Sequence, residues 1–297
     1  MHEFRVTEKA LLLEYLFKHL AHLKRTKIRQ ILKYGSVRVN GRVTTSHAYV
    51  LKSGDTVDVL KPQDAWAQRL KEEMDLRVVY EDDQIIVAEK PSGLLTMGTD
   101  TEKERTLYFQ LTEYVRAKSP DGMGRVFIVH RLDRDASGLV LFAKTEEAKK
   151  SLQQNWDAAD KRYYAVTEGT PDPAQGTIES HLKEDKSRRV YSTRGTVGGS
   201  KLSITHYKVI ENNGYYALLD VRLETGRKNQ IRVHLSELGH PVAGDRKYGA
   251  GTDLIRRLAL HAYHLGILHP TTGQKMQFHI RMPSGFRRLF GAGRGQE

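Results

Sequence analysis

Hydrophobic residues recur at helical spacing in the first 35 residues of the chain. Residues 7–20 are predicted to form an amphipathic helix with Thr7 as a candidate N-cap. A second amphipathic helix is predicted over residues 24–35, where Gly35 is a typical stop. The apolar residues expected to face the core are Leu12, Tyr15, Leu16, Leu20, Ile28, Ile31 and Leu32.

The hydrophobic period then shortens to two, which is typical of strands. Residues 36–43 alternate in this way and contain Asn40-Gly41, a dipeptide that favours a two-residue hairpin turn. Residues 50–60 are predicted to form another strand pair around Gly54-Asp55. Two helices and these strands predict a small α/β domain over residues 1–60.

A polar segment over residues 61–75 begins with a Lys-Pro pair and is predicted to be a linker with a turn of helix. Strands predominate after it, with two helices. Many strands and few helices predict an α+β domain over residues 76–297, built on a mixed, mostly antiparallel sheet. The expected strands lie in 77–91, 124–133, 138–145, 161–169, 203–210 and 215–226, and the expected helices in 146–156 and 228–239.

Charge narrows the class of partner. The chain of 297 residues carries a formal net charge of +12, and residues 1–60 hold 11 Lys and Arg against 5 Asp and Glu, a net of +6. This balance indicates a polyanion, either nucleic acid or an acidic membrane surface. No apolar run approaches the ~20 residues of a membrane span, and Glu14 and Lys18 interrupt the apolar segment near the N-terminus. The absence of cysteine excludes disulfides and thiolate metal sites. We therefore expect a soluble, cytoplasmic protein.

A dense charged cluster, His130-Arg-Leu-Asp-Arg-Asp-Ala-Ser-Gly138, comes directly before a predicted buried strand. A lone aspartate in such a place is more often structural than catalytic. A catalytic interpretation requires an arginine and an aromatic residue from elsewhere in the chain. Residues 161–169 supply two tyrosines, and residues 223–249 supply arginines, a histidine and several glycine turns.

Taken in order, these segments resemble the RluA family of RNA pseudouridine synthases over about residues 76–285. The resemblance rests on His-Arg-Leu-Asp-x-x-x-Ser-Gly-Leu, Lys-x-Tyr-x-Ala, Leu-x-Thr-Gly-Arg-x-x-Gln-Ile-Arg-Val-His, Gly-Asp-x-x-Tyr-Gly and Leu-Ala-Leu-His-Ala-Tyr-His-Leu-Gly-Ile-Leu-His-Pro. Residues 1–60, with Gly-x-Val-x-Val-Asn-Gly and a late Gly-Asp, resemble the S4-type RNA-binding domain. The fold implied is the pseudouridine synthase fold with a small N-terminal S4-type α/β domain.

The family resemblance assigns roles to residues of the larger domain. It implies Asp133 as the nucleophile, Tyr163 as the aromatic residue that contacts the uracil, and Arg232 as the partner that holds Asp133 ionised and can orient it bidentately. It implies Arg131 as the residue that occupies the space left by the target base. The remaining substrate-binding residues that it implies are His130, Arg227 and Gln230.

The S4-type resemblance implies that the second helix and the hairpin contact structured RNA. Arg25, Arg29 and Lys33 recur every four residues, and like charges at this spacing repel unless an anion binds. The implied RNA contacts are Arg25, Lys27, Arg29, Lys33, Arg38 and Arg42. An S4-type domain ahead of this catalytic domain indicates ribosomal RNA of the large subunit as the expected substrate, with transfer RNA as the alternative.

The implied reaction converts uridine to pseudouridine without a redox change, so no cofactor and no metal are expected. The target base must leave its helix to reach Asp133, which predicts base flipping. Three departures from the family pattern are Glu89 for a usual Asn, Ala136 after the catalytic motif, and Asn229 for a usual His. We expect a monomer that does not bind membranes.

Three other functions remain open at this point. A glycoside hydrolase would use Asp133 and Asp135 as a carboxylate pair. A metal enzyme would use His261, His264 and His269, although the surrounding alternation is typical of a strand. A non-catalytic RNA-binding or ribosome-assembly protein would keep the fold without the reaction.

Overall fold

The computed structural model describes residues 2–33, 35–60, 71–72, 74–119 and 121–291. The chain forms two compact units, Met1–Leu76 with Gln110–Val126, and Arg77–Phe109 with Phe127–Glu297. Helix α4 (Leu107–Lys118) carries the chain from the second unit into the first. Most of the predicted linker lies outside the described residues, and the domain limits 1–60, 61–75 and 76–297 stay a prediction.

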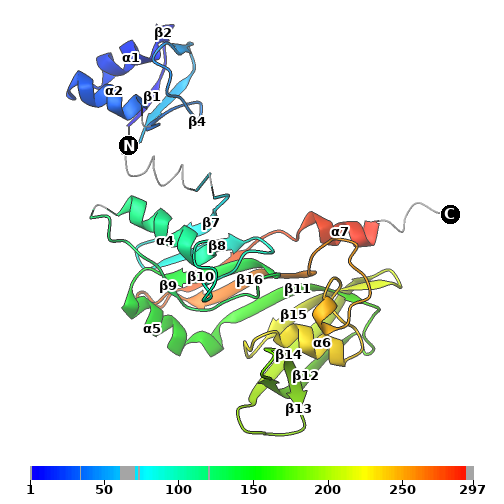
Figure 1. Cartoon of the computed structure of the whole chain (residues 1–297). Coiled ribbons are helices and arrows are strands. Elements are labelled where there is room, and N and C mark those ends of the chain that lie inside the picture. The colour runs from blue at the N-terminus through cyan, green and yellow to red at the C-terminus, as the bar shows by residue number, and fades with distance from the viewer. Residues whose placement is uncertain (1, 34, 61–70, 73, 120, 292–297) are drawn as a thin grey trace, which may run out of the picture. The chain divides into compact units, whose positions relative to one another are not determined.

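The first unit is a small α/β structure (Figure 1). Helices α1 and α2 pack on an antiparallel sheet of order β1-β6-β3-β4, and a separate pair joins β2 to β5. The elements are β1 (His2–Arg5), β2 (Ala10–Leu11), α1 (Leu12–His19), α2 (Arg25–Lys33), β3 (Val37–Val39), β4 (Arg42–Val43), β5 (Val50–Leu51) and β6 (Thr56–Val59). All seven apolar residues expected to face the core are buried, which confirms the helical pattern.

Two local predictions for this unit are wrong. The first helix begins at Leu12, after the short strand β2, so Thr7 is not its N-cap. Strands β5 and β6 do not pair with each other, because β5 pairs with β2 and β6 pairs with β1 and β3. The Asn40-Gly41 turn is confirmed, with both residues at positive φ as a hairpin of this type requires.

The second unit is built on one large sheet, in which eleven of the strands described belong together. Its order is β13-β12-β14-β15-β11-β16-β10-β8-β7, with β17 beside β16 and β9 beside β10. Only β10 and β16 run parallel among these described pairs, which confirms the mostly antiparallel prediction. The strands are β7 (Arg77–Glu81), β8 (Ile85–Lys90), β9 (Phe127–Ile128), β10 (Ser137–Ala143), β11 (Asp160–Glu168), β12 (Gln175–Glu184), β13 (Val190–Thr193), β14 (Lys201–Asn212), β15 (Tyr216–Leu223), β16 (Leu260–Leu268) and β17 (Lys275–His279).

Short helices lie against this sheet at different places along it (Figure 1). The helix α5 (Glu146–Gln154), capped by Thr145, packs near β9 and β10, whereas α6 (Gln230–Glu237) packs near β13 and β14. The two helices predicted here are therefore confirmed. Those not predicted are α4, the short helices η1 (Trp156–Ala158) and η2 (Arg246–Tyr248), and α7 (Ser284–Gly291).

Gly138 fixes where the charged cluster meets the sheet. Its φ is +123°, and a side chain there would place a Cβ 2.3 Å from the carbonyl oxygen of Ala262. Only glycine permits this approach of β10 to β16. The loop that carries Asp133 therefore enters β10 where this strand lies directly against β16.

No helix in the described part of the chain is both long and apolar enough to cross a membrane.

Candidate active site

The backbone on each side of Asp133 is held by buried polar groups. Thr96 exchanges hydrogen bonds with the main chain of Leu132, at 2.8 and 3.1 Å. Lys90 is 0% exposed, and its Nζ donates to the carbonyls of Pro91, Leu94 and Arg134 at 2.9, 2.7 and 2.9 Å. These bonds join the loop after β8 to the loop of Asp133. The carboxylate is thus carried on a fixed backbone although it lies outside any helix or strand.

Arg232 on α6 reaches Asp133 from a sequence distance of 99 residues. Its Nη1 lies 3.3 Å from Oδ2 of Asp133. Its stronger partner is Asp245, because Nε and Nη2 donate to the two carboxylate oxygens at 2.6 and 2.8 Å. Burial alone would lower the pKa of Arg232, but the hydrogen bonds and charge of Asp245, together with Asp133, raise it. The bidentate pairing expected between Arg232 and Asp133 is therefore wrong, and Asp245 takes that place.

Asn229 completes the support of Arg232. It adopts a left-handed backbone at the start of α6, with φ of 55°. Its Oδ1 accepts a bond of 3.0 Å from Nη1 of Arg232, and its Nδ2 donates to the Tyr248 hydroxyl at 2.9 Å. The ring of Tyr248 also lies 5.0 Å from the Arg232 guanidinium. Asn229 therefore links Arg232 to Tyr248, at the position where the RluA family usually has histidine.

Sequence reasoning gave no role to Asn229, Asp245 or Tyr248. Two of them lie in Gly244-Asp-Arg-Lys-Tyr-Gly249, a motif that served only to recognise the family. The one feature of the sequence that could have indicated this role is Asp245 itself, an acidic residue in a glycine-rich turn 13 residues after Arg232. The pairing itself depends on how the turn after α6 folds back on that helix.

Tyr163 approaches the site from β11. The register between β11 and β16 shifts between Arg162 and Tyr163, and such a bulge re-aims the side chains of a strand. Burial raises the pKa of Tyr163, and the charge of Asp133 raises it further. Tyr164 instead stacks on Tyr263, with ring centroids 3.8 Å apart. The phenol of Tyr163 is therefore protonated near neutral pH.

Asp133, Tyr163 and Arg232 line one pocket of about 70 Å³. Arg131 and Arg227 line it too and are exposed, which places two further cations at its rim. The pocket is otherwise lined by Leu132, Ala136, Leu223, Gly226, Asn229, Gln230, Ile231 and Leu260. A carboxyl group, a phenol and three guanidiniums around a small hollow suit a base attached to a charged backbone.

Gln230 lines the pocket but its amide is fully engaged within the protein. Its Oε1 accepts from Thr225 and from the Arg227 backbone at 2.8 and 2.9 Å, and its Nε2 donates to Ile204 and Thr205 at 3.0 and 2.9 Å. These four bonds use the two acceptor and two donor positions of a side-chain amide. Gln230 therefore shapes the turn that carries Arg227.

His130 does not line the pocket. Its ring stacks on Trp156, with centroids 4.4 Å apart, and its Nε2 accepts a bond of 3.0 Å from the Leu141 backbone. Burial, with a smaller contribution from Lys161, lowers the pKa of His130 to about 3. A neutral imidazole that accepts from the main chain fixes the start of the charged loop, so the substrate-binding role expected for His130 gives way to a positioning one.

The features on which the alternative functions depend do not converge. Asp135 lines a different hollow from Asp133, so the two carboxylates do not face one bond. His261 bonds Ser137, His264 bonds Asp160, and His269 bonds Asp82. Within the described ranges, no three His, Asp or Glu residues are grouped to hold a metal ion.

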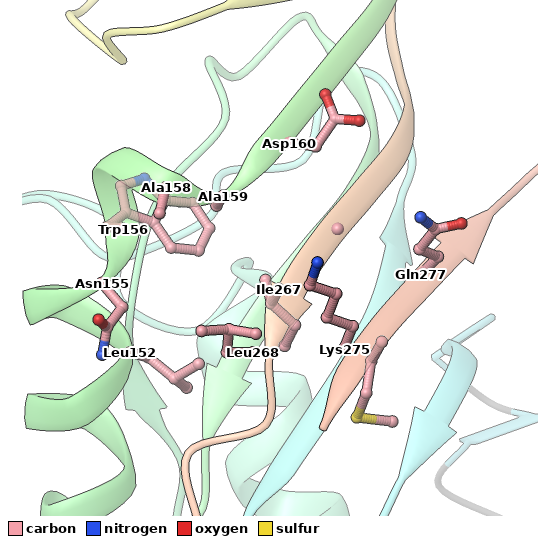
Figure 2. A pocket seen from close by; sticks show the side chains of 12 residues that line it. Leu152, Asn155, Trp156, Ala158, Ala159, Asp160, Ile267, Leu268, Lys275 and Gln277 are labelled. Atoms are coloured by element: carbon pink, nitrogen blue, oxygen red, sulfur yellow. The ribbon is translucent and has the colours of Figure 1, made fainter. Parts of the chain in front are cut away.

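A second pocket of about 150 Å³ lies between η1, β16 and β17 (Figure 2). Trp156, Leu152 and Ile267 surround it, with Asp160 and Lys275 nearby. None of the predicted site residues lines it. It is a mainly apolar hollow, separate from the charged cluster.

In the first unit, Arg25 and Arg29 both lie over the ring of Phe17, at 5.1 and 5.5 Å. Arg38 differs from the other predicted RNA contacts, because it is half-buried and pairs with Glu72 at 3.3 Å. The exposed members of the set are Arg25, Lys27, Arg29, Lys33 and Arg42.

The sequence of the chain matches two known protein families. Residues 84–237 match the family model described as RNA pseudouridylate synthase, and residues 12–57 match the S4 domain. The chain belongs to the RNA pseudouridine synthase family. It is an RluA-type pseudouridine synthase with an N-terminal S4-type domain, and hence an isomerase that acts on RNA.

Relatives support this membership along most of the chain, and a solved structure shares the fold. An uncharacterized RNA pseudouridine synthase of Bacillus subtilis is 36% identical over 269 residues, which cover 89% of this chain and 88% of the relative. Ribosomal large subunit pseudouridine synthase D of Zymomonas mobilis is 32% identical, with coverage of 91% and 90%. The human RNA pseudouridylate synthase domain containing 4 shares the fold, with a TM-score of 0.61 and 21% identity over 77% of this chain and 97% of that chain.

Proposed function

We propose that this pseudouridine synthase modifies uridines of large-subunit ribosomal RNA, with Asp133 as the nucleophile. The observation that carries the assignment is the contact between Asp133 and Arg232, made in a pocket that Tyr163 also lines. Arg232 is itself held by Asp245 and Asn229. A carboxylate kept in place by a restrained guanidinium is pre-organised for attack.

The reaction needs no outside reactant. The bond between the ribose C1′ and uracil N1 breaks, the bond between C1′ and C5 forms, and a proton moves from C5 to N1. Arg232 contacts Oδ2 of Asp133, so Oδ1 is the candidate attacking atom. Attack on the uracil ring, attack on the ribose and a glycal route all use this carboxylate.

Tyr163 acts by contact with the uracil ring. Because its pKa is raised, its hydroxyl is a poor base near neutral pH. The ring supports the flipped base in the pocket. Arg131 lies exposed at the rim, where it is suited to fill the gap that a flipped uridine leaves in the RNA.

Two observations support ribosomal RNA as the substrate. Relatives from Zymomonas mobilis, Vibrio cholerae and Neisseria meningitidis, 32 to 33% identical, are named ribosomal large subunit pseudouridine synthase D. The S4-type domain presents the exposed basic side chains of α2 and the hairpin, which favour structured RNA. We propose cytoplasmic action on this RNA, with the protein as a monomer.

The test is pseudouridine mapping of ribosomal and transfer RNA from cells that lack the gene, rescued with wild type, Asp133→Asn or Asp83→Asn. Asp83 is a matched control because it is an exposed aspartate of the same unit and lines neither the pocket of Asp133 nor the hollows beside it. We expect a ribosomal site that returns with wild type and Asp83→Asn only. Rescue by Asp133→Asn would refute the nucleophile, and a lost site in transfer RNA alone would refute the substrate.

The contribution of the S4-type domain is tested with the double variant Arg25→Gln/Arg29→Gln. We expect weaker binding to ribosomal RNA fragments and a shallower salt dependence, because each lost phosphate contact reduces the slope. The conversion rate at saturating RNA should change little. Lys9→Gln, an exposed lysine of the same unit, is the control. Equal affinity of the double variant and the control would contradict RNA contact by α2.

A further inference from the structure

The active-site pocket is the first of three hollows on the second unit, and each hollow shares one lining residue with the next. Arg232 lines both this pocket and a hollow of about 540 Å³, which is also lined by Arg246, Lys247 and Arg257. Arg256 lines that second hollow and a third one of about 890 Å³. We call the second and third hollows together the flanking groove.

The flanking groove is lined by residues of α6, of the segment after α6 that contains η2, and of α7. The segment after α6 forms its floor, where the Gly244 backbone meets that of Arg257 so closely that a Cβ at Gly244 would lie 2.2 Å from the Arg257 carbonyl oxygen. The turn between β14 and β15 and one face of α7 form its far end. The groove is thus built from ordered segments of one unit.

Cations predominate along the flanking groove. Six positive side chains and three aspartates line it, so three positive charges are in excess. Two of the aspartates are ion-paired within the groove, Asp245 with Arg232 and Asp253 with Arg246. The positive side chains that line it are Arg232, Arg246, Lys247, Arg256, Arg257 and Arg288. This excess of positive charge, on the other side of Arg232 from the pocket of Asp133, complements a phosphate backbone.

Arg256, which lines both hollows of the groove, has a strained backbone. Its φ is +54°, in the left-handed region that favours glycine or asparagine. The side chain is exposed. Backbone strain of this kind clusters at sites that bind ligands.

Tyr215 supplies an aromatic surface at the far end of the groove. It is 80% exposed, more than any other large hydrophobic side chain in the described residues, and Leu254 opposite it is 71% exposed. The turn is nevertheless firmly held, because Oδ1 of Asn213 accepts from the Tyr215 and Tyr216 backbones and its Nδ2 donates to Leu289 of α7. An exposed aromatic ring on a fixed turn beside arginines is the arrangement that stacks nucleobases.

We propose that the RNA strand next to the target uridine leaves the active site through the flanking groove. Its phosphates bind Arg246, Arg256 and Arg288, and an unpaired base stacks on Tyr215. The inference rests on the proposed function, since it takes the pocket of Asp133 as the place of the target base. It adds a binding site for the flanking nucleotides, on the opposite side of Arg232 from the nucleophile.

The test measures how affinity grows with RNA length. Uridine-centred oligoribonucleotides, extended on the 5′ side or on the 3′ side, are titrated against the full-length protein. For wild type, extension on one of the two sides should tighten binding. Tyr215→Ala should lose about fivefold or more of this gain, the lower limit for one stacked base. Arg256→Gly should reduce the salt slope by about 0.7 for one lost phosphate contact.

Two controls separate binding from folding and from charge. Arg256→Gly relaxes the backbone while it removes the side chain, so its unfolding midpoint should not fall below that of wild type. Lys150→Gln removes a positive charge from α5, at an exposed residue that lines none of the three hollows, and should bind as wild type does. The shortest oligonucleotide should bind all variants equally.

A second readout locates the strand directly. A 4-thiouridine placed in the extension should crosslink to the peptide that contains Tyr215. Crosslinks confined to α5, or a length gain that Tyr215→Ala and Arg256→Gly leave intact, would overturn the inference. Failure of the proposed function gives a different result. In that case Asp133→Asn would still form pseudouridine, whether or not RNA length affects the affinity.

Discussion

Asp245→Asn tests whether Arg232 is placed by its buried partner rather than by Asp133. The Asp245 side chain is 1% exposed and that of Arg232 is 9% exposed, and two short bonds of 2.6 and 2.8 Å join them. Asparagine keeps the shape but turns an NH₂ group toward a guanidinium that can only donate. Removal of one partner from a buried ion pair costs about 3–5 kcal/mol, which is about 100- to 4000-fold in the folding equilibrium.

The assay is guanidinium denaturation of wild type, Asp245→Asn and Glu184→Gln. Glu184 pairs with Lys228 near the surface, where both side chains are 41% exposed, so its loss should cost less than about 1 kcal/mol. Asp245→Asn should also lower the rate of pseudouridine formation at saturating RNA, because Nη1 of Arg232 is no longer aimed at Asp133. A stability within about 1 kcal/mol of wild type, with an unchanged rate, would refute the positioning argument.

Three further outcomes follow from buried groups of the second unit. Lys90→Met should destabilise the fold by about 3 kcal/mol, since three carbonyl acceptors lose their donor; a melting temperature equal to wild type would contradict this. Gly138→Ala should prevent a stable fold, because its Cβ would lie 2.3 Å from Ala262, and soluble protein with a native circular dichroism spectrum would argue otherwise. Burial lowers the pKa of both His234 and His261 to about 4; the unfolded chain therefore takes up protons first as pH falls below about 6.5, and stability should fall between pH 6.5 and 4 by up to about 3 kcal/mol per histidine. His234→Gln should flatten this profile in acid denaturation, and an unchanged profile would count against the buried neutral imidazole.

Local patterns in the sequence were sufficient for the elements whose stability depends on near neighbours. The amphipathic spacing identified α1 and α2, and the Asn40-Gly41 dipeptide identified the hairpin, because each is decided within one or two turns of chain. The family motifs likewise drew attention to Asp133, Tyr163 and Arg232, which line one pocket. These motifs could not reveal that the main ion-pair partner of Arg232 is Asp245.

What the sequence by itself determined was the alternation of elements, the mostly antiparallel α+β class, the S4-type domain and the family. Only the tertiary structure decided that β5 and β6 join different sheets, that His130 packs on Trp156, and that Asp245 holds Arg232. The physical reason is the same in each case. Strand pairing and buried ion pairs depend on which distant residues meet and exclude water, whereas periodicity and turn preference are properties of the local chain.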